Sequence, residues 1–358
     1  MNFYTLTFKK KILISFILIF VGLVVIDIGL YFVAKMKSTK TTFINDKFSK
    51  IIHMNLNNPI NKDIIFVGSS RTFYHIDTNI FKNKEIDIYN FGISGAQFED
   101  YPTIIPYINK VKPKKIIIGL SVYRLYDKLN ISKYPTLEEI KYYYNIDKIK
   151  FLEALKQWII NRHLFLQYSE PIYYKLKSIY EKFNSHTNSI INVISNTKDN
   201  IKDENKIFID SFINYSKLVG CKVFDIKQTG DYQITLKCTN GDGILIGNHI
   251  DYKKVSKTKI FLKDFNKDSI KYINQIINNF DKNIQVVLIL EPILHNPYQY
   301  DIKKIKKQFK GTKIIDLTNY KIQDNFWSDN SHVNYKGKKQ YSEHLIKLVK
   351  SMKGGKEK

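Results

Sequence analysis

The chain has 358 residues and a formal net charge of +24, from 57 Lys and Arg against 33 Asp and Glu. This length leaves room for one large domain or two ordinary ones, and 44% hydrophobic and 14% aromatic residues exclude a largely disordered chain. The two cysteines are too few for a disulfide scaffold and match no zinc-ligand spacing, so we predict no metal.

The positive charge does not by itself predict nucleic-acid binding. Only three of the cations are arginines, namely Arg71, Arg124 and Arg162, although arginine is the residue preferred for bidentate phosphate and base contacts. The abundance of Lys, Ile and Asn is typical of an A+T-rich genome. We attribute most of the charge to that bias and the remainder to an acidic partner, either anionic lipid or an anionic surface polymer.

The first segment with a clear pattern is the apolar stretch 12–33, which is interrupted by one charge, Asp27. As a helix it is about 33 Å long, enough to cross a hydrocarbon core. No small-residue cleavage site follows it, so we predict a retained transmembrane anchor rather than a signal peptide. Asp27 either lies close enough to the interface to be tolerated or contacts a partner membrane protein. Lysines on both sides leave the orientation open.

Five short apolar runs predict buried strands of a parallel sheet. They are residues 64–68, 86–91, 115–120, 285–290 and 313–317. The segments between the first three are long enough for crossover helices, and residues 264–280 have apolar side chains near helical spacing. We therefore expect an α/β protein, with helices on both faces of a five-stranded parallel sheet.

Residues 121–260 do not follow this alternation and are interpreted as an insertion. Residues 135–182 are predicted to be helical, and residues 184–205 to form a mobile polar loop. An alternating strand at 232–239, an Asn240-Gly241 turn and a second strand at 244–246 predict a β-hairpin. The expected division is an anchor at 1–34, a juxtamembrane segment at 35–60, a domain formed by 61–120 and 261–350 around the insertion, and a basic tail at 351–358.

Two groups of residues at predicted strand ends have the composition of a nucleophilic site. Ser70 lies in Gly68-Ser69-Ser70-Arg71, directly after the first strand, where open α/β sheets bind ligands. Asp329 precedes His332 by three residues after the last strand, so the carboxylate can orient the imidazole, which can then take a proton from a serine. Taken alone, the first group is equally consistent with a helix cap, and the second is more often structural.

Together these residues resemble the SGNH (GDSL-like) hydrolase family over roughly residues 60–125 and 260–350. The resemblance implies a three-layer, flavodoxin-like α/β/α fold with Ser70 as nucleophile, His332 as base and Asp329 as orienting carboxylate. The block Asn90-Phe-Gly-Ile-Ser-Gly-Ala is similar to the family's oxyanion turn. It assigns Gly95, with Gly92 as the weaker choice, beside the Ser70 amide.

One block departs from the family pattern, because no asparagine follows the third strand. The chain has Gly119-Leu-Ser-Val-Tyr123-Arg124 instead. An oxyanion donor is therefore missing or replaced by Arg124, Tyr123 or a residue of the insertion, and losing such a donor can cost about 3 kcal/mol of transition-state stabilisation. Arg71, Tyr123 and Arg124 are also possible substrate-binding residues, although a surface ion pair is the commoner role for Arg71.

The resemblance is strongest to membrane-anchored proteins that acylate surface polymers, such as the teichoic-acid D-alanylation and alginate O-acetylation proteins. It implies an extracytoplasmic catalytic domain with a cytoplasmic N-terminus, a surface glycan or polymer as substrate, and a membrane-bound O-acyltransferase as partner. It implies no cofactor. The expected activity is serine-dependent acyl transfer or ester hydrolysis, and the alternative is an inactive module that binds glycan or scaffolds a membrane complex.

Two further features remain open to more than one interpretation. His75 lies five residues after Ser70, but His332 has the better carboxylate partner, so a structural role for His75 is favoured. Cys221 and Cys238 form a disulfide in an oxidising compartment or remain two buried thiols.

Overall fold

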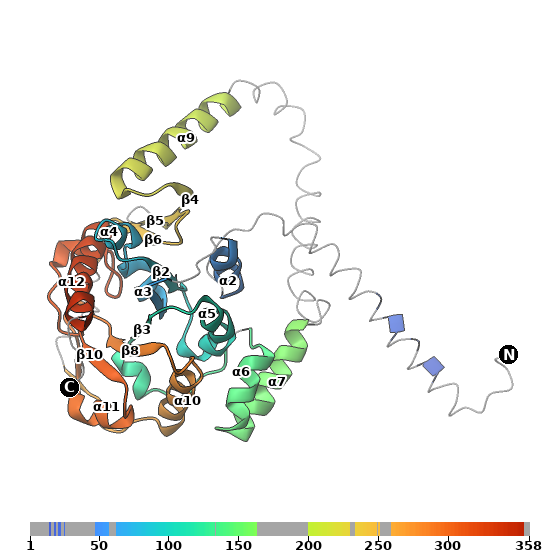
Figure 1. Ribbon diagram of the computed structural model, residues 1–358. Coiled ribbons are helices and arrows are strands. Elements are labelled where there is room, and N and C mark those ends of the chain that lie inside the picture. Colours follow the sequence, from blue (N-terminus) through green and yellow to red (C-terminus); the bar gives the residue numbers. More distant parts are fainter. Residues whose placement is uncertain are drawn as a thin grey trace, which may run out of the picture.

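A computed structural model describes most of the chain outside the N-terminal region and the middle of the insertion (Figure 1). The described residues are 14–15, 18, 21–22, 25, 47–56, 62–132, 134–162, 200–229, 233–248, 250 and 259–353. The expected membrane span at 12–33 lies mostly outside them. No helix within the described ranges has the length and hydrophobicity that a bilayer crossing requires.

A five-stranded parallel sheet forms the centre of the molecule, as predicted. Its strands are β1 (Ile64–Gly68), β2 (Ile88–Gly92), β3 (Lys115–Leu120), β8 (Gln285–Leu290) and β10 (Lys313–Asp316). They lie in the order β10-β8-β3-β1-β2, and every neighbouring pair is parallel. The carboxyl ends of β1, β2 and β3 therefore meet at one edge of the sheet.

The strands are apolar on both faces because helices cover both. Side chains alternate along each strand, so Ile65 and Val67 of β1 enter one core while Ile64 and Phe66 enter the other. The first core packs against α5 (Ile105–Val111), α10 (Lys267–Asn278) and α11 (Ile302–Gln308). The second packs against α4 (Thr78–Lys82) and α12 (Tyr335–Lys353), which lie on the opposite side of the sheet (Figure 1).

One helix of this domain is the helix that the apolar spacing at 264–280 predicts. That helix is α10, which begins after Asn266, whose side chain accepts the Ser269 N–H. The remaining elements are α3 (Ser70–His75), the 3-10 helices η2 (Phe98–Thr103), η3 (Val122–Leu125) and η4 (Asp324–Phe326), and the strand pair β7 (Ile260–Phe261) and β9 (Tyr298–Gln299).

The segment before the sheet contributes a helix to the fold, which its polar sequence does not indicate. This helix, α2 (Lys47–Leu56), buries Ile51 and Met54 in the first core. It also buries two lysines: Lys47 Nζ lies 2.6 Å from Glu139 Oε1, and Lys50 Nζ donates to the Gly241 carbonyl at 2.5 Å. Both lysines reach partners in the insertion, so α2 ties the insertion to the domain.

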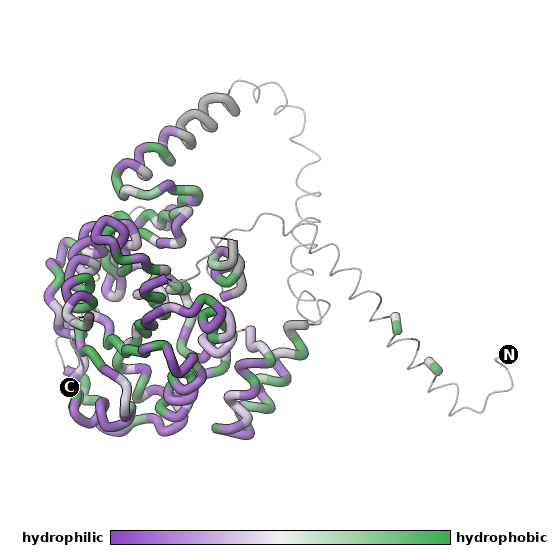
Figure 2. The backbone as a smooth tube through the Cα atoms, viewed as in Figure 1, coloured by the Kyte–Doolittle hydropathy of each residue, from purple (hydrophilic) through white to green (hydrophobic). Residues whose placement is uncertain are grey.

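The insertion contains a helical part and a small sheet. Its helices are α6 (Leu137–Tyr144), α7 (Lys148–Arg162) and α9 (Asn200–Val219), and its sheet is β4 (Val223–Thr229), β5 (Gln233–Cys238) and β6 (Gly243–Ile246) in antiparallel order. Hydrophobic and hydrophilic residues are mixed along α6 and α7 (Figure 2), and α7 leaves Ile149, Leu152 and Ile159 exposed.

The predicted hairpin is confirmed by β5 and β6, but the insertion differs from the prediction in two other respects. The strand β4 was not predicted. Residues 200–205, which were expected in a mobile loop, form the first turns of α9. The remaining part of that expected loop, and residues 163–182 of the predicted helical part, lie outside the described residues.

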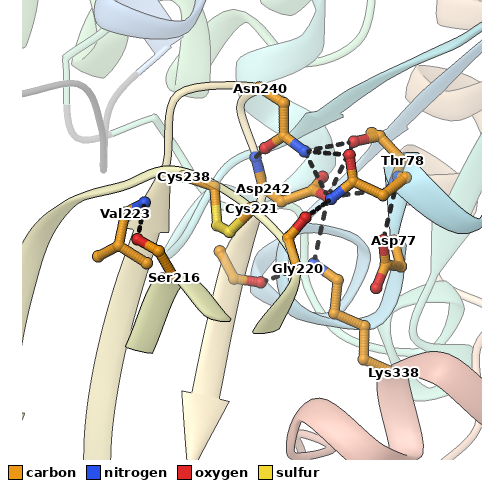
Figure 3. The surroundings of a disulfide bond; sticks show 12 residues. Asp77, Thr78, Ser216, Gly220, Cys221, Val223, Cys238, Asn240, Asp242 and Lys338 are labelled. Atoms are coloured by element: carbon orange, nitrogen blue, oxygen red, sulfur yellow. Dashed lines mark hydrogen bonds and ion pairs between the residues drawn. A yellow bond between two sulfur atoms is a disulfide. The ribbon is translucent and has the colours of Figure 1, made fainter. Parts of the chain in front are cut away.

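Cys221 and Cys238 form a disulfide, which resolves the alternative that their sequence left open (Figure 3). The bond joins Cys221, two residues before β4, to Cys238, the last residue of β5, with 5.8 Å between the Cα atoms. Beside it, the Asp242 carboxylate accepts from the N–H and hydroxyl of Thr78 at 2.9 and 3.0 Å, and Lys338 Nζ lies 3.7 Å away. The small sheet is thus both crosslinked and anchored to the α/β domain.

We predict that replacing both cysteines with alanine lowers the free energy of unfolding of the insertion sheet. The closed loop spans 17 residues, and a disulfide of that size contributes roughly 3 kcal/mol, mainly by restricting the unfolded chain. Urea unfolding of the double variant and of wild type, each with and without dithiothreitol, measures this. Reductant should destabilise wild type alone, and equal midpoints in all four samples would contradict the prediction.

Candidate functional site

Ser70 lies at the turn from β1 into α3, where the Thr72 side chain leaves no space for a side chain at position 68. A Cβ on Gly68 would lie 1.8 Å from Thr72 Oγ1, so only glycine allows this close approach. Ser69 caps α3 and its side chain accepts the Arg71 N–H at 3.4 Å. Ser69 thus has the capping role and leaves the Ser70 side chain free for another.

The structure brings Ser70, His332 and Asp329 into one hydrogen-bonded chain. His332 Nε2 lies 2.8 Å from Ser70 Oγ, across 262 positions of sequence. On the far side of the ring, His332 Nδ1 lies 3.0 and 2.9 Å from the two oxygens of Asp329. With Nδ1 protonated and donating to the carboxylate, Nε2 can accept the Ser70 hydroxyl proton.

The loop that carries His332 is held by its own backbone. Trp327 and Val333 form an antiparallel bridge, and the Ser328 N–H donates to the His332 carbonyl at 2.7 Å. Asp329 Oδ1 accepts the N–H groups of Ser331 and His332 at 2.8 and 2.9 Å. This tight turn fixes Asp329 and His332 relative to each other before any contact with Ser70.

Gln233, from β5 of the insertion, extends this support. Its amide nitrogen donates to Ser328 Oγ at 2.9 Å and to Asp329 Oδ2 at 3.3 Å. Burial would raise the pKa of Asp329, but its hydrogen bonds and the charge of His332 outweigh burial and lower it to about 2. Asp329 is therefore ionised at neutral pH and stabilises an imidazolium at His332.

His75 contacts the same loop through a hydrogen bond to its backbone. It is fully buried, and its Nε2 accepts the Val333 N–H at 3.2 Å. Burial lowers the pKa of His75 well below its usual value, with the charges of His332 and Arg71 in the same direction. A neutral imidazole that accepts a backbone N–H is a structural partner of the His332 loop, the role that the sequence favoured.

Hydrogen bonding around the turn at the end of β2 distinguishes the two glycines proposed as oxyanion donors, Gly92 and Gly95. The Gly92 N–H donates to Asn90 Oδ1 at 2.9 Å, so it is already occupied. Gly95 has φ +81°, a conformation that favours glycine. Among the residues that the structure describes, neither the Gly95 N–H nor the Ser70 N–H donates to a protein acceptor. Both remain available to an oxyanion.

The three possible substrate-binding residues share one cavity with Ser70 and His332. The cavity has a volume of about 280 Å³ and is lined by Arg71, Tyr123 and Arg124, together with Gly95. The guanidinium of Arg124, however, lies 2.8 Å from Glu99 Oε1 and 3.6 Å from Asp127 Oδ2. Arg124 therefore neutralises buried Glu99, whereas Tyr123 packs near Tyr298, with 5.5 Å between the ring centroids.

Sequence reasoning missed Gln233 and Tyr74, whose ring edge contacts the His332 imidazole at 5.4 Å between centroids. Tyr74 follows Ser70 by four residues in α3, a helical spacing that could have indicated it. Nothing in the sequence around Gln233 marks it, because it reaches the site through the packing of the insertion sheet. No cluster of three or more His, Cys, Asp or Glu side chains suited to a metal occurs within the described part of the chain.

Comparisons with known proteins add no family assignment. No protein-family model matches the chain, and the search of curated proteins finds no match. The chemical interpretation therefore depends on the geometry of the site.

We predict that Asp329→Asn removes a pH-dependent part of the stability. Because the pKa of Asp329 is lowered to about 2, from an ordinary value of about 4, ionised Asp329 contributes roughly 2 kcal/mol. That contribution is complete above pH 4 and is lost as the pH falls toward 2. Thermal unfolding of wild type and Asp329→Asn between pH 2 and 6 should give curves that converge at the acid end.

The matched control is Asp264→Asn, which changes an exposed carboxylate. A gap between wild type and Asp329→Asn that stays constant down to pH 2 would show that the carboxylate is not held in this network.

Proposed function

We propose that the protein is a serine acyltransferase or esterase of the SGNH type, with Ser70, His332 and Asp329 as catalytic residues. The observation that carries this proposal is the 2.8 Å contact between His332 Nε2 and Ser70 Oγ, with Asp329 on the other ring nitrogen. The strand order β2-β1-β3-β8-β10 supports it, because this is the flavodoxin-like order of doubly wound sheets. Such sheets bind ligands at the carboxyl ends of their strands, where Ser70 lies.

The proposed reaction proceeds through an acyl-enzyme. His332 Nε2 takes the Ser70 proton while Ser70 Oγ attacks the carbonyl carbon of an ester donor. The Ser70 and Gly95 amides stabilise the negative oxygen of the tetrahedral intermediate. The imidazolium then gives its proton to the leaving alcohol. An incoming hydroxyl gives its proton to His332 Nε2 as it attacks the acyl carbon, and His332 passes that proton to Ser70 Oγ as the bond between Ser70 and the acyl group breaks.

The acceptor hydroxyl distinguishes transfer from hydrolysis. A sugar or polyol hydroxyl gives an O-acylated polymer, and water gives a free acid. We propose transfer of an acetyl or similar group to a cell-surface glycan or polymer, because the resemblance to membrane-anchored acylation proteins favours it. No cofactor is needed for either reaction.

The proposed location is the outer side of the cytoplasmic membrane, with the 12–33 segment as a single-pass anchor. The Cys221–Cys238 disulfide supports this location, since disulfides persist in oxidising compartments. By the same resemblance, a membrane-bound O-acyltransferase is the proposed partner that supplies the acyl group across the membrane.

We predict that a fluorophosphonate probe labels Ser70 and that Ser70→Ala abolishes the labelling. His332→Ala should slow labelling by about 10²–10⁴-fold, because it removes the general base. Ser69→Ala is the matched control: it removes a neighbouring hydroxyl that serves as a helix cap, and it should remain labelled. In-gel fluorescence and peptide mapping measure this, and equal labelling of wild type and Ser70→Ala would refute the proposed nucleophile.

We also predict that Gln233→Ala slows labelling by about 3- to 10-fold, the net value of a hydrogen bond that orients Asp329. Gln228→Ala changes an exposed glutamine on the adjacent strand β4 and serves as the control. Labelling rates that are equal for both variants and wild type would show that the insertion does not support the catalytic carboxylate.

A further inference from the structure

Arg71 is a buried cation beside the proposed nucleophile. Its side chain follows Ser70 in the first turn of α3, and the residue is only 6% exposed. It lines the 280 Å³ cavity that also contains Ser70 and His332. Arg71 is therefore placed to contact whatever molecule presents an acyl group to Ser70.

The guanidinium of Arg71 has no partner among the residues that the structure describes. Among the described residues, its Nη1 is buried without a hydrogen-bond acceptor, and no carboxylate lies within ion-pair distance of the group. Arg124, in the same cavity, has the opposite arrangement, because Glu99 and Asp127 both pair with it. The surface ion pair that the sequence favoured for Arg71 is thus absent from the described part of the chain.

The buried side chain of Glu291 interacts electrostatically with Arg71, but the two form no ion pair in the described part of the chain. Glu291 is 2% exposed, and its Oε1 accepts the Thr72 hydroxyl at 2.6 Å. Burial raises the pKa of Glu291 to about 7, although Thr72 and Arg71 oppose this. Its Oε2 has no hydrogen-bond partner among the described residues.

A buried charge without a partner is costly, and arginine is the residue that binds oxyanions with two parallel hydrogen bonds. We propose that Arg71 is the binding residue for an anionic group of the substrate, a carboxylate or a phosphate, in the cavity beside Ser70. Arg71 and Ser70 line the same cavity, so this anionic group lies close to the ester or hydroxyl that reacts.

This inference rests on the proposed function and specifies its substrate class. It identifies an acidic sugar or a phosphorylated polyol rather than a neutral glycan. Both substrates carry an oxyanion that Arg71 can bind. In an acidic sugar this group is a carboxylate, and in a phosphorylated polyol it is a phosphate.

Equilibrium binding to the full-length chain in detergent tests the proposal without requiring catalysis. All proteins carry Ser70→Ala, and calorimetry measures the affinity for inorganic phosphate and for acetate at constant ionic strength. Adding Arg71→Gln should weaken the better-bound anion by about tenfold or more. Arg71→Lys should give an intermediate affinity, because lysine keeps the charge and loses the bidentate geometry.

Lys128→Gln removes one exposed positive charge that does not line the cavity and should leave the affinity unchanged. Tighter phosphate binding identifies a phosphorylated polyol, and tighter acetate binding identifies an acidic sugar. No measurable binding, or equal binding with arginine and glutamine in proteins that melt alike, would overturn the anion site. If a fluorophosphonate does not label Ser70 in wild type, the proposed function is overturned but the anion site is not, because the binding assay does not require the Ser70 hydroxyl.

Discussion

A single carboxylate organises the candidate site. Asp329 accepts two backbone N–H groups from its own turn, the imidazole N–H of His332 and the side-chain amide of Gln233. These donors outweigh the cost of burying the carboxylate, so it remains charged, and the orientation of His332 follows from it. The 2.8 Å approach of His332 to Ser70 depends on this arrangement.

The sheet brings these residues together because parallel strands end at a common edge. Four of the five strands agree closely with the apolar runs in the sequence, since buried parallel strands are apolar on both faces. The same argument placed Ser70 and His332 at one edge from their positions after strands alone. The Asp329-x-x-His332 spacing then indicated which imidazole the serine would meet.

Other features depended on tertiary contacts that no local pattern shows. Lys47 and Lys50 make α2 look like a solvated linker, yet partners from the insertion bury them both. Gln233 is an ordinary polar residue of an alternating strand, and the contacts that anchor the insertion sheet to the α/β domain, such as Asp242 with Thr78, place it against Asp329. Likewise, the sequence suggested an ion pair for Arg71, and burial beside Glu291 gave it a different environment.

The central claim of this account is that Ser70 carries the acyl group during turnover. A quench experiment tests this claim directly. The full-length protein is mixed with an acetyl ester, the reaction is quenched in acid within the first turnover, and the peptides are mapped by mass spectrometry. The account predicts an acetyl group on the peptide that contains Ser70, formed in wild type and absent from His332→Ala. Ester turnover by wild type with no acetylated peptide, or with acetylation at another residue, would contradict it.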